Sequence, residues 1–160
     1  MTIVMRLRRP MLVAVLVLVA IGAAGGTVPR GRAGADPSTV FNLRPAVPDP
    51  VLSTLRRACF DCHSEATRWP WYATLPLALR VIERDVTDAR GQLNLSRWTD
   101  YNQFDRADLL DKMCERASRR TMPPWQYRLM HPGARLSATE VSALCTWTQD
   151  EAARLTQGEK

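Results

Sequence analysis

The segment Cys59-Phe60-Asp61-Cys62-His63 constrains this chain more than any other, because it places two thiols and an imidazole within five residues. Two cysteines three positions apart on one helical turn present both sulfurs to the same side. Such a pair can form thioethers with the two vinyl groups of one porphyrin, and the histidine that follows is placed as an axial ligand of its iron. The C-x-x-C-H (CxxCH) spacing therefore predicts one covalent haem c on Cys59 and Cys62, with His63 as the metal-binding residue.

Two other classes of site also use paired cysteines. A dithiol oxidoreductase carries C-x-x-C after a β-strand in an α/β pattern, and this sequence has no alternating run long enough to predict a strand. A structural zinc site needs four ligands, and the remaining cysteines, Cys114 and Cys145, stand singly. A zinc or disulfide structural module is the alternative class, and the histidine beside Cys62 favours haem.

The favoured second axial ligand is Met122, in the segment Thr121-Met122-Pro123-Pro124. The two prolines restrict the backbone and remove amide donors, so this loop can hold a thioether in one place. Methionine–histidine ligation raises the reduction potential of a haem iron, which suits an electron carrier. His131 is the alternative sixth ligand, and an open sixth position is the third option.

The N-terminal segment, residues 1–35, predicts export from the cytoplasm. Arg6, Arg8 and Arg9 precede an apolar run of 14 residues from Met11 to Ala24, and a small-residue Ala-Gly-Ala sequence ends at position 35. These features are typical of a signal peptide, although the run also resembles a short membrane anchor, for which about 20 residues are needed. Both interpretations place the domain in the periplasm or another extracytoplasmic compartment, after a linker over residues 36–48.

The charge distribution argues against nucleic-acid binding. The chain has 22 basic and 16 acidic residues, and residues 1–35 contain five of the arginines and none of the acids. The remaining 17 basic and 16 acidic residues nearly balance, whereas a nucleic-acid-binding domain needs a basic surface.

Apolar periodicity and capping residues predict an all-α domain over residues 49–157. The expected helices begin near Asp49, Leu77, Asp105 and Ser137. The first is expected to be capped by Asp49 and to run into Cys59, and Gly91 is expected to end the second. Ser137 and Glu140 have the spacing of a capping box at the start of the last helix.

Cys114 and Cys145 fall on the third and last predicted helices. In an oxidising compartment, two leftover cysteines favour a disulfide. Two separate buried thiols are the alternative.

Aromatic and basic side chains supply further candidates for the haem pocket. Flat apolar rings are expected to line it, with ordinary core packing as the alternative for some of them; the candidates are Trp69, Trp71, Tyr72, Trp98, Trp125 and Trp147. Arginines are expected to pair with the haem propionates; the candidates are Arg68, Arg80, Arg97 and Arg128.

Beyond the C-x-x-C-H motif, the sequence resembles the small bacterial haem-binding domain family of exported c-type cytochromes. The match includes Ala58 to Thr67, the Pro-Trp-Tyr at 70–72, Leu93 to Trp98, Met122-Pro123-Pro124 and His131-Pro132. It extends from about Val51 to Trp147, and Cys114 and Cys145 are additions to the family pattern. The resemblance implies one haem c in an exported or membrane-tethered protein. The expected fold is an all-α domain similar to class I cytochromes c around one haem, with its N- and C-terminal helices crossing.

These features together predict a monohaem c-type cytochrome that performs one-electron transfer in the periplasm and is not an enzyme. Its redox partner proteins are not indicated by the sequence, and a membrane tether is the further partner that the N-terminal segment suggests. The alternative function is a haem-based module that binds or senses a small ligand at a labile sixth position.

Overall fold

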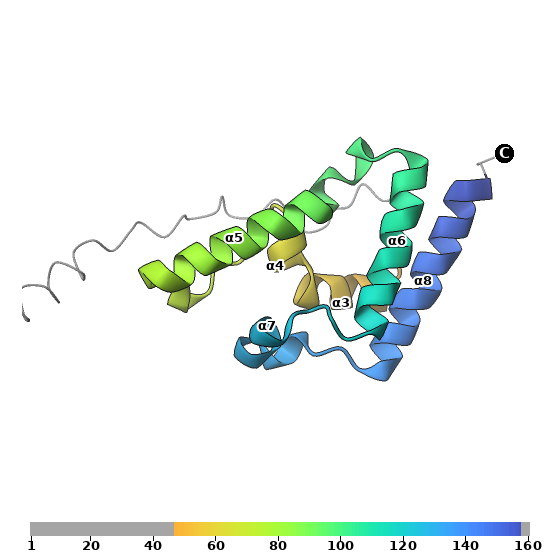
Figure 1. Ribbon diagram of the computed structural model, residues 1–160. Coiled ribbons are helices and arrows are strands. Elements are labelled where there is room, and N and C mark those ends of the chain that lie inside the picture. The colour runs from red at the N-terminus through yellow and green to blue at the C-terminus, as the bar shows by residue number, and fades with distance from the viewer. Residues whose placement is uncertain (1–46, 158–160) are drawn as a thin grey trace, which may run out of the picture. The chain divides into compact units, whose positions relative to one another are not determined.

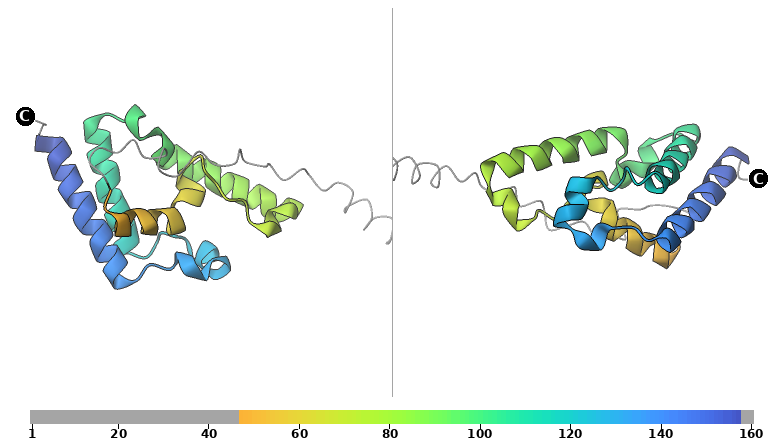
Figure 2. Two further views of the ribbon diagram at one scale, coloured as in Figure 1. Left: turned by 180° about the vertical axis from the view of Figure 1, so that it is seen from behind. Right: turned by 60° about the horizontal axis from the view of Figure 1, so that its bottom comes forward.

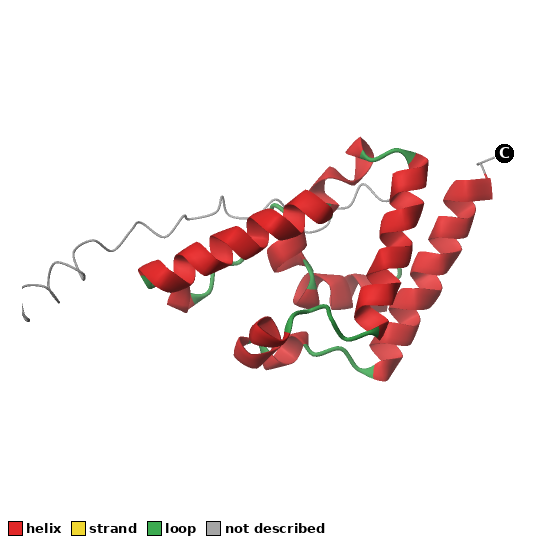
Figure 3. Cartoon of the chain, in the orientation of Figure 1, coloured by secondary structure: helices red, strands yellow, loops and turns green. Residues whose placement is uncertain are grey.

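The computed structural model describes residues 47–157, in which every regular element is a helix (Figure 3). The all-α prediction is therefore confirmed for this part of the chain. The predicted signal or anchor segment, 1–35, and all but the last two residues of the predicted linker lie outside the described residues. The helices are α3 (Asp49–Ala58), α4 (Phe60–His63), η1 (Trp71–Thr74), α5 (Pro76–Gln92), η2 (Leu95–Asp100), α6 (Gln103–Ser118), α7 (Trp125–Met130), η3 (Pro132–Ala134) and α8 (Ala138–Gln157).

The chain divides into two compact units, whose described parts are Trp69–Glu83 and, together, residues 47–68 and 84–157. The first unit contains η1 and the start of α5. Its turn is closed locally, because the Thr74 hydroxyl donates to the Trp71 carbonyl at 2.9 Å and the Leu75 amide donates to the Tyr72 carbonyl at 3.0 Å. Trp71 and Tyr72 meet edge to face, with ring centroids 5.7 Å apart.

The second unit is built on α6 and α8, which lie side by side (Figures 1 and 2). Helix α3 packs against α8, so the first and last described helices are in contact. Buried apolar side chains from these helices, from α4 and from the segment around η2 form one core, in which burial of apolar surface stabilises the fold. The core residues are Val51, Leu55, Phe60, Leu93, Leu95, Trp98, Ala107, Leu110, Ala117, Leu144, Trp147 and Ala152.

The start of α8 has the capping box predicted from its sequence. The Glu140 amide donates to the Ser137 hydroxyl at 3.2 Å, and the Ser137 amide donates to the Glu140 carboxylate at 2.8 Å. Arg57 of α3 also forms a salt bridge with Glu140. Backbone hydrogen bonding at Ser137 and the charge of Arg57 lower the pKa of Glu140, so this carboxylate links two helices as an anion.

The ends of the other helices differ from the predictions. Asp49 is not the cap of α3 but its first residue, because the carbonyl of Pro48 already accepts the Leu52 amide at 2.9 Å. Gly91 does not end α5, which continues to Gln92. Glycine permits a helix to stop but does not require it when a helical backbone is also available.

Helix α6 begins two residues before the predicted Asp105, because Asn102 caps it. The Asn102 side-chain oxygen accepts the amides of Phe104 at 2.9 Å and of Asp105 at 3.0 Å. Asparagine is a preferred N-cap residue because its side chain satisfies amides that have no partner within the helix. The asparagine was the signal in the sequence that locates this helix start.

Candidate haem site

The two cysteines of the C-x-x-C-H motif lie on one helical turn. Cys59 lies between α3 and α4, and Cys62 lies within α4. The carbonyl of Cys59 accepts the amides of Cys62 at 3.2 Å and of His63 at 2.9 Å. Both cysteines are half-buried and neither is in a disulfide. The two thiols are therefore not used in a disulfide, and they lie on a turn whose backbone is held by these two hydrogen bonds.

The thiols of this turn are held in their protonated form. Burial raises the pKa of Cys59 to about 12, with a further contribution from Cys62. Burial, followed by the negative charges of Asp61 and Asp85, raises the pKa of Cys62 to about 11. Reactive cysteines of dithiol oxidoreductases have lowered pKa values, so this environment differs from theirs.

The imidazole of His63 has a defined direction and protonation. Its Nδ1 lies 3.0 Å from the backbone carbonyl of Leu93. A carbonyl only accepts hydrogen bonds, so Nδ1 carries the proton and the lone pair of the neutral ring is on Nε2. Burial lowers the pKa of His63 against the opposing effect of this hydrogen bond. The ring is therefore neutral at pH 7 and has the nitrogen that an iron ligand needs.

The loop after the motif is fixed by Arg90, a residue that the sequence did not single out. Its guanidinium donates to the Ser64 carbonyl from Nε at 2.9 Å and from Nη2 at 2.6 Å, and to the Thr67 hydroxyl at 2.8 Å. Ser64 is fully buried, and its hydroxyl donates to the Phe60 carbonyl at 2.7 Å. These bonds hold the residues that follow His63 against the C-terminal part of α5.

Asp61, between the two cysteines, is the second feature that the sequence did not reveal. Its carboxylate accepts the Tyr127 hydroxyl at 2.8 Å, although 66 positions separate the two residues. It also accepts Nε of Arg68 at 3.0 Å. Burial and the adjacent carboxylate raise the pKa of Tyr127, so its hydroxyl keeps the proton that it donates. No local pattern encodes this long-range contact.

The two candidates for the sixth ligand lie in the segment between α6 and α8. Met122 is 40% exposed, and its amide donates to the Arg116 carbonyl at 3.3 Å, at the end of α6. The ring of His131 stacks on Tyr127 with centroids 4.1 Å apart, and its Nδ1 lies 3.2 Å from the Tyr127 carbonyl. Both assignments to iron stay predictions.

Large apolar side chains are exposed around α7. This helix buries none of its residues. The exposed large apolar residues of this segment are Met122, Trp125, Leu129 and Met130. An apolar surface of this kind suits a flat macrocycle. The thiol pair and the oriented imidazole form a donor set that fits haem.

The candidate aromatic residues separate into core and surface. Trp98 and Trp147 are core residues of the second unit, which agrees with the alternative of ordinary packing for these two. Trp125 is 64% exposed in the second unit, and Trp71 is 77% exposed in the first. Of the candidate arginines, Arg68 and Arg97 already form salt bridges, with Asp61 and Glu65 respectively.

Cys114 of α6 and Cys145 of α8 form the disulfide that the sequence predicted, with an S–S distance of 2.02 Å. The bond joins the two helices that pack side by side. Because these sulfurs bond to each other, they are not ligands that would complete a zinc site with Cys59 and Cys62.

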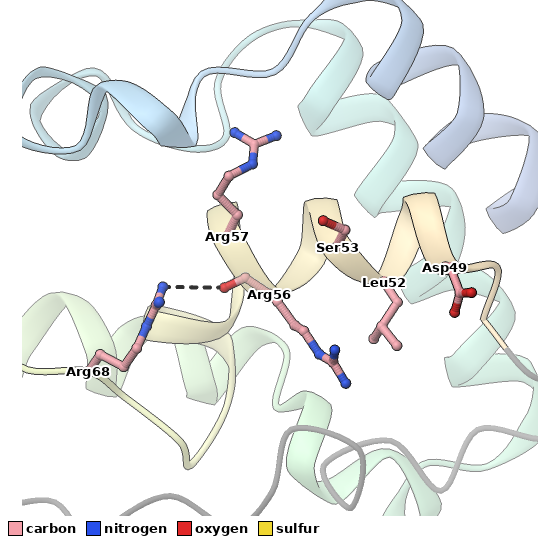
Figure 4. A pocket seen from close by; sticks show the side chains of 6 residues that line it. All are labelled: Asp49, Leu52, Ser53, Arg56, Arg57 and Arg68. Atoms are coloured by element: carbon pink, nitrogen blue, oxygen red, sulfur yellow. Dashed lines mark hydrogen bonds between the residues drawn. The ribbon is translucent and has the colours of Figure 1, made fainter.

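A shallow hollow of about 430 Å³ lies on the α3 side of the second unit (Figure 4). Its lining is mostly polar and positively charged, and comprises Asp49, Leu52, Ser53, Arg56, Arg57 and Arg68. Arg68 reaches the Arg56 carbonyl there at 3.5 Å. Neither cysteine of the motif lines this hollow, so it is distinct from the turn that carries them.

No helix within residues 47–157 is both long and apolar enough to cross a membrane.

Comparisons with known proteins identify the family. The chain has no significant match among curated proteins or among solved structures. A family model described as a haem-binding domain matches residues 18–150, which is well over half of the 160 residues. The match and the donor set at Cys59, Cys62 and His63 agree, and the chain belongs to the haem-binding domain family.

Proposed function

We propose that this protein is a monohaem c-type cytochrome, located outside the cytoplasm, that transfers single electrons between partner proteins. The observation that carries the proposal is the hydrogen bond from His63 Nδ1 to the Leu93 carbonyl, at 3.0 Å. It leaves the lone pair of a neutral imidazole on Nε2, in the same turn as two thiols that form no disulfide. Ligating histidines commonly have their other nitrogen fixed in this way.

In this proposal, Cys59 and Cys62 hold the haem. Each thiol would add its S–H across one vinyl group, which gives a thioether and no other product. His63 and Met122 would be the iron ligands, with His131 as the alternative to Met122. The closed turn of α4 and the Arg90 bonds to the following loop keep the three attachment residues in a fixed arrangement.

The bound haem supplies a one-electron iron couple. Residues of this chain would set the conditions for that couple, because His63 and Met122 would both be ligands of the iron. With both ligands supplied by protein side chains, no position would be left for a substrate. This arrangement is the reason for proposing an electron carrier and not an enzyme.

The extracytoplasmic location is supported by the disulfide and by the N-terminal sequence. Disulfides such as Cys114–Cys145 persist in oxidising compartments such as the bacterial periplasm. The basic and apolar residues of the segment 1–35 have the order expected of a signal peptide or a membrane anchor.

The function is tested on the full chain produced with a haem c maturation system. A pyridine haemochrome assay measures the haem per chain, and a potentiometric titration measures the number of electrons per haem. One covalent haem with a one-electron Nernst slope is expected, together with slow or absent binding of carbon monoxide to the reduced protein. Rapid binding of carbon monoxide to the unmodified protein would favour the small-ligand sensor instead.

The double substitution of Cys59 and Cys62 by alanine is the matched control for covalent attachment. It should leave a chain without covalent haem. The double substitution of Cys114 and Cys145 by alanine, which removes the same number of thiols, should keep the haem.

A further inference from the structure

We propose that Asp61 and Tyr127 are positioning residues. Their hydrogen bond places the Met122 loop, residues 121–124, against the haem attachment turn, residues 59–63. This inference rests on the proposed function, because it concerns the sixth ligand of the haem. It assigns a role to the residue between the two cysteines and to a tyrosine of α7.

The position of Asp61 makes it suitable for this role. It lies in the same turn as both cysteines, and its side chain is only 12% exposed. Arg68 fixes the carboxylate through Nε at 3.0 Å and Nη2 at 3.3 Å. The Thr67 hydroxyl also donates to the Asp61 backbone carbonyl at 2.7 Å. The carboxylate that accepts from Tyr127 is therefore held in place by residues outside α7.

The position of α7 makes the bond to Tyr127 important. Helix α7 has no fully buried residue and Tyr127 is only half-buried, so burial contributes little to its placement. It packs against the short helix η3. The bond between the Tyr127 hydroxyl and Asp61, at 2.8 Å, connects α7 to the turn that carries the cysteines.

The connection from Tyr127 to Met122 is short and stiff. Five positions separate the two residues, and two of the intervening residues are Pro123 and Pro124. Proline restricts the backbone φ angle, so displacement at one end of this segment is passed to the other. At the other end, the amides of Thr121 and Met122 donate to the Arg116 carbonyl, at 3.1 and 3.3 Å. The Met122 loop is thus fixed by α6 on one side and by Asp61 on the other.

The test compares Tyr127→Phe with the unmodified protein, both carrying haem. Phenylalanine keeps the ring that stacks on His131 and removes only the hydroxyl. Loss of a hydrogen bond to a carboxylate should loosen Met122, so carbon monoxide should bind the reduced protein about tenfold faster or more. The sulfur-to-iron charge-transfer band of the oxidised protein should weaken, while intact mass should still show one haem.

Asp61→Asn provides a second variant and a thermodynamic cycle. It keeps an oxygen acceptor for Tyr127 but removes the charge, so a smaller effect in the same direction is expected. In the double variant, the effects should add less than fully, because both substitutions weaken the bond from Tyr127, while Asp61→Asn also weakens the bonds from Arg68. Asp108→Asn is the matched control: it removes the carboxylate of an exposed salt bridge with Lys112 and should leave the spectrum unchanged.

The outcomes separate this inference from the proposed function. If Met122→Ala changes the spectrum but Tyr127→Phe matches the unmodified protein, the positioning role is overturned and the function stands. Additive effects in the double variant, or loss of haem attachment in Tyr127→Phe, would also overturn the positioning role. If the unmodified protein holds no covalent haem, or if Met122→Ala leaves the spectrum unchanged, the ligand assignment fails and this inference fails with it.

Discussion

The imidazole of His63 is hydrogen bonded through Nδ1 to the backbone carbonyl of Leu93, 30 positions further along the chain and 3.0 Å away. Leu93 is buried, so the acceptor lies in the core and does not depend on a flexible side chain. Met122, the proposed ligand on the other side of the iron, lies instead in a partly exposed loop. The two proposed ligands therefore differ in burial, because His63 is oriented by a carbonyl of the core and Met122 lies in a partly exposed loop.

The proposed ligation by Met122 predicts the effect of Met122→Ala. The variant should keep its covalent haem, because neither cysteine changes, but it should lose the low-spin methionine spectrum. The reduced variant should bind carbon monoxide readily. Visible spectra with and without carbon monoxide measure this, and His131→Ala is the matched variant, expected to keep the methionine spectrum. A change in His131→Ala alone would instead assign the sixth position to His131.

Arg90→Met should destabilise the protein by about 2 kcal/mol, because it removes charged hydrogen bonds to the Ser64 carbonyl and the Thr67 hydroxyl. Methionine keeps much of the aliphatic length of the arginine. The free energy of unfolding is measured in urea. Arg84→Met, which removes an exposed salt bridge to Asp85, should cost less than about 0.5 kcal/mol. Equal effects of the two substitutions would argue against the role of Arg90.

Replacing Cys114 and Cys145 together by alanine should lower the free energy of unfolding by about 3–4 kcal/mol, from the loop-closure entropy of a cross-link. The two cysteines are 31 positions apart. Haem content should be unchanged, since the disulfide joins α6 to α8 and not the attachment turn. Chemical denaturation and intact mass measure both quantities. Unchanged stability in the double variant would contradict the structural role.

Glu140→Gln tests the link between α3 and α8. Glutamine keeps the neutral part of the capping box but loses the salt bridge to Arg57, so the unfolding free energy at pH 7 should fall by about 0.5–1 kcal/mol. The pKa of Glu140 is lowered in the folded state from its usual 4.5. The contribution of its charge is therefore complete above pH 4.5 and is lost as the pH falls through the lowered value.

Glu115→Gln is the control for this pH dependence, because Glu115 forms an exposed salt bridge with Arg119 within α6. Its effect at pH 7 should be smaller than that of Glu140→Gln. Curves of stability against pH should show the unmodified protein and Glu140→Gln converging in acid. A difference between them that persisted in acid would contradict the electrostatic explanation.

The sequence predicted those features that depend on neighbouring residues. The C-x-x-C-H turn, the Ser137–Glu140 capping box and the helical character of the domain each arise within a few positions. Helix ends were less predictable. Gly91 is compatible with a helix end and with a helix interior. At α6, the capping residue Asn102 and the apolar pattern that begins near Asp105 indicate different start positions.

Long-range contacts at the site were not predictable from one sequence. The bonds of His63 to Leu93 and of Asp61 to Tyr127 depend on how helices pack, and no local spacing encodes them. The Cys114–Cys145 disulfide was predictable at long range because the chain has only four cysteines and the motif uses two.

The most direct measurement of the central proposal is the intact mass and visible spectrum of the full chain after haem c maturation. We expect a mass higher than that of the polypeptide by one haem, retained under denaturing conditions, and a low-spin c-type spectrum. Colourless protein at the mass of the polypeptide alone would contradict it.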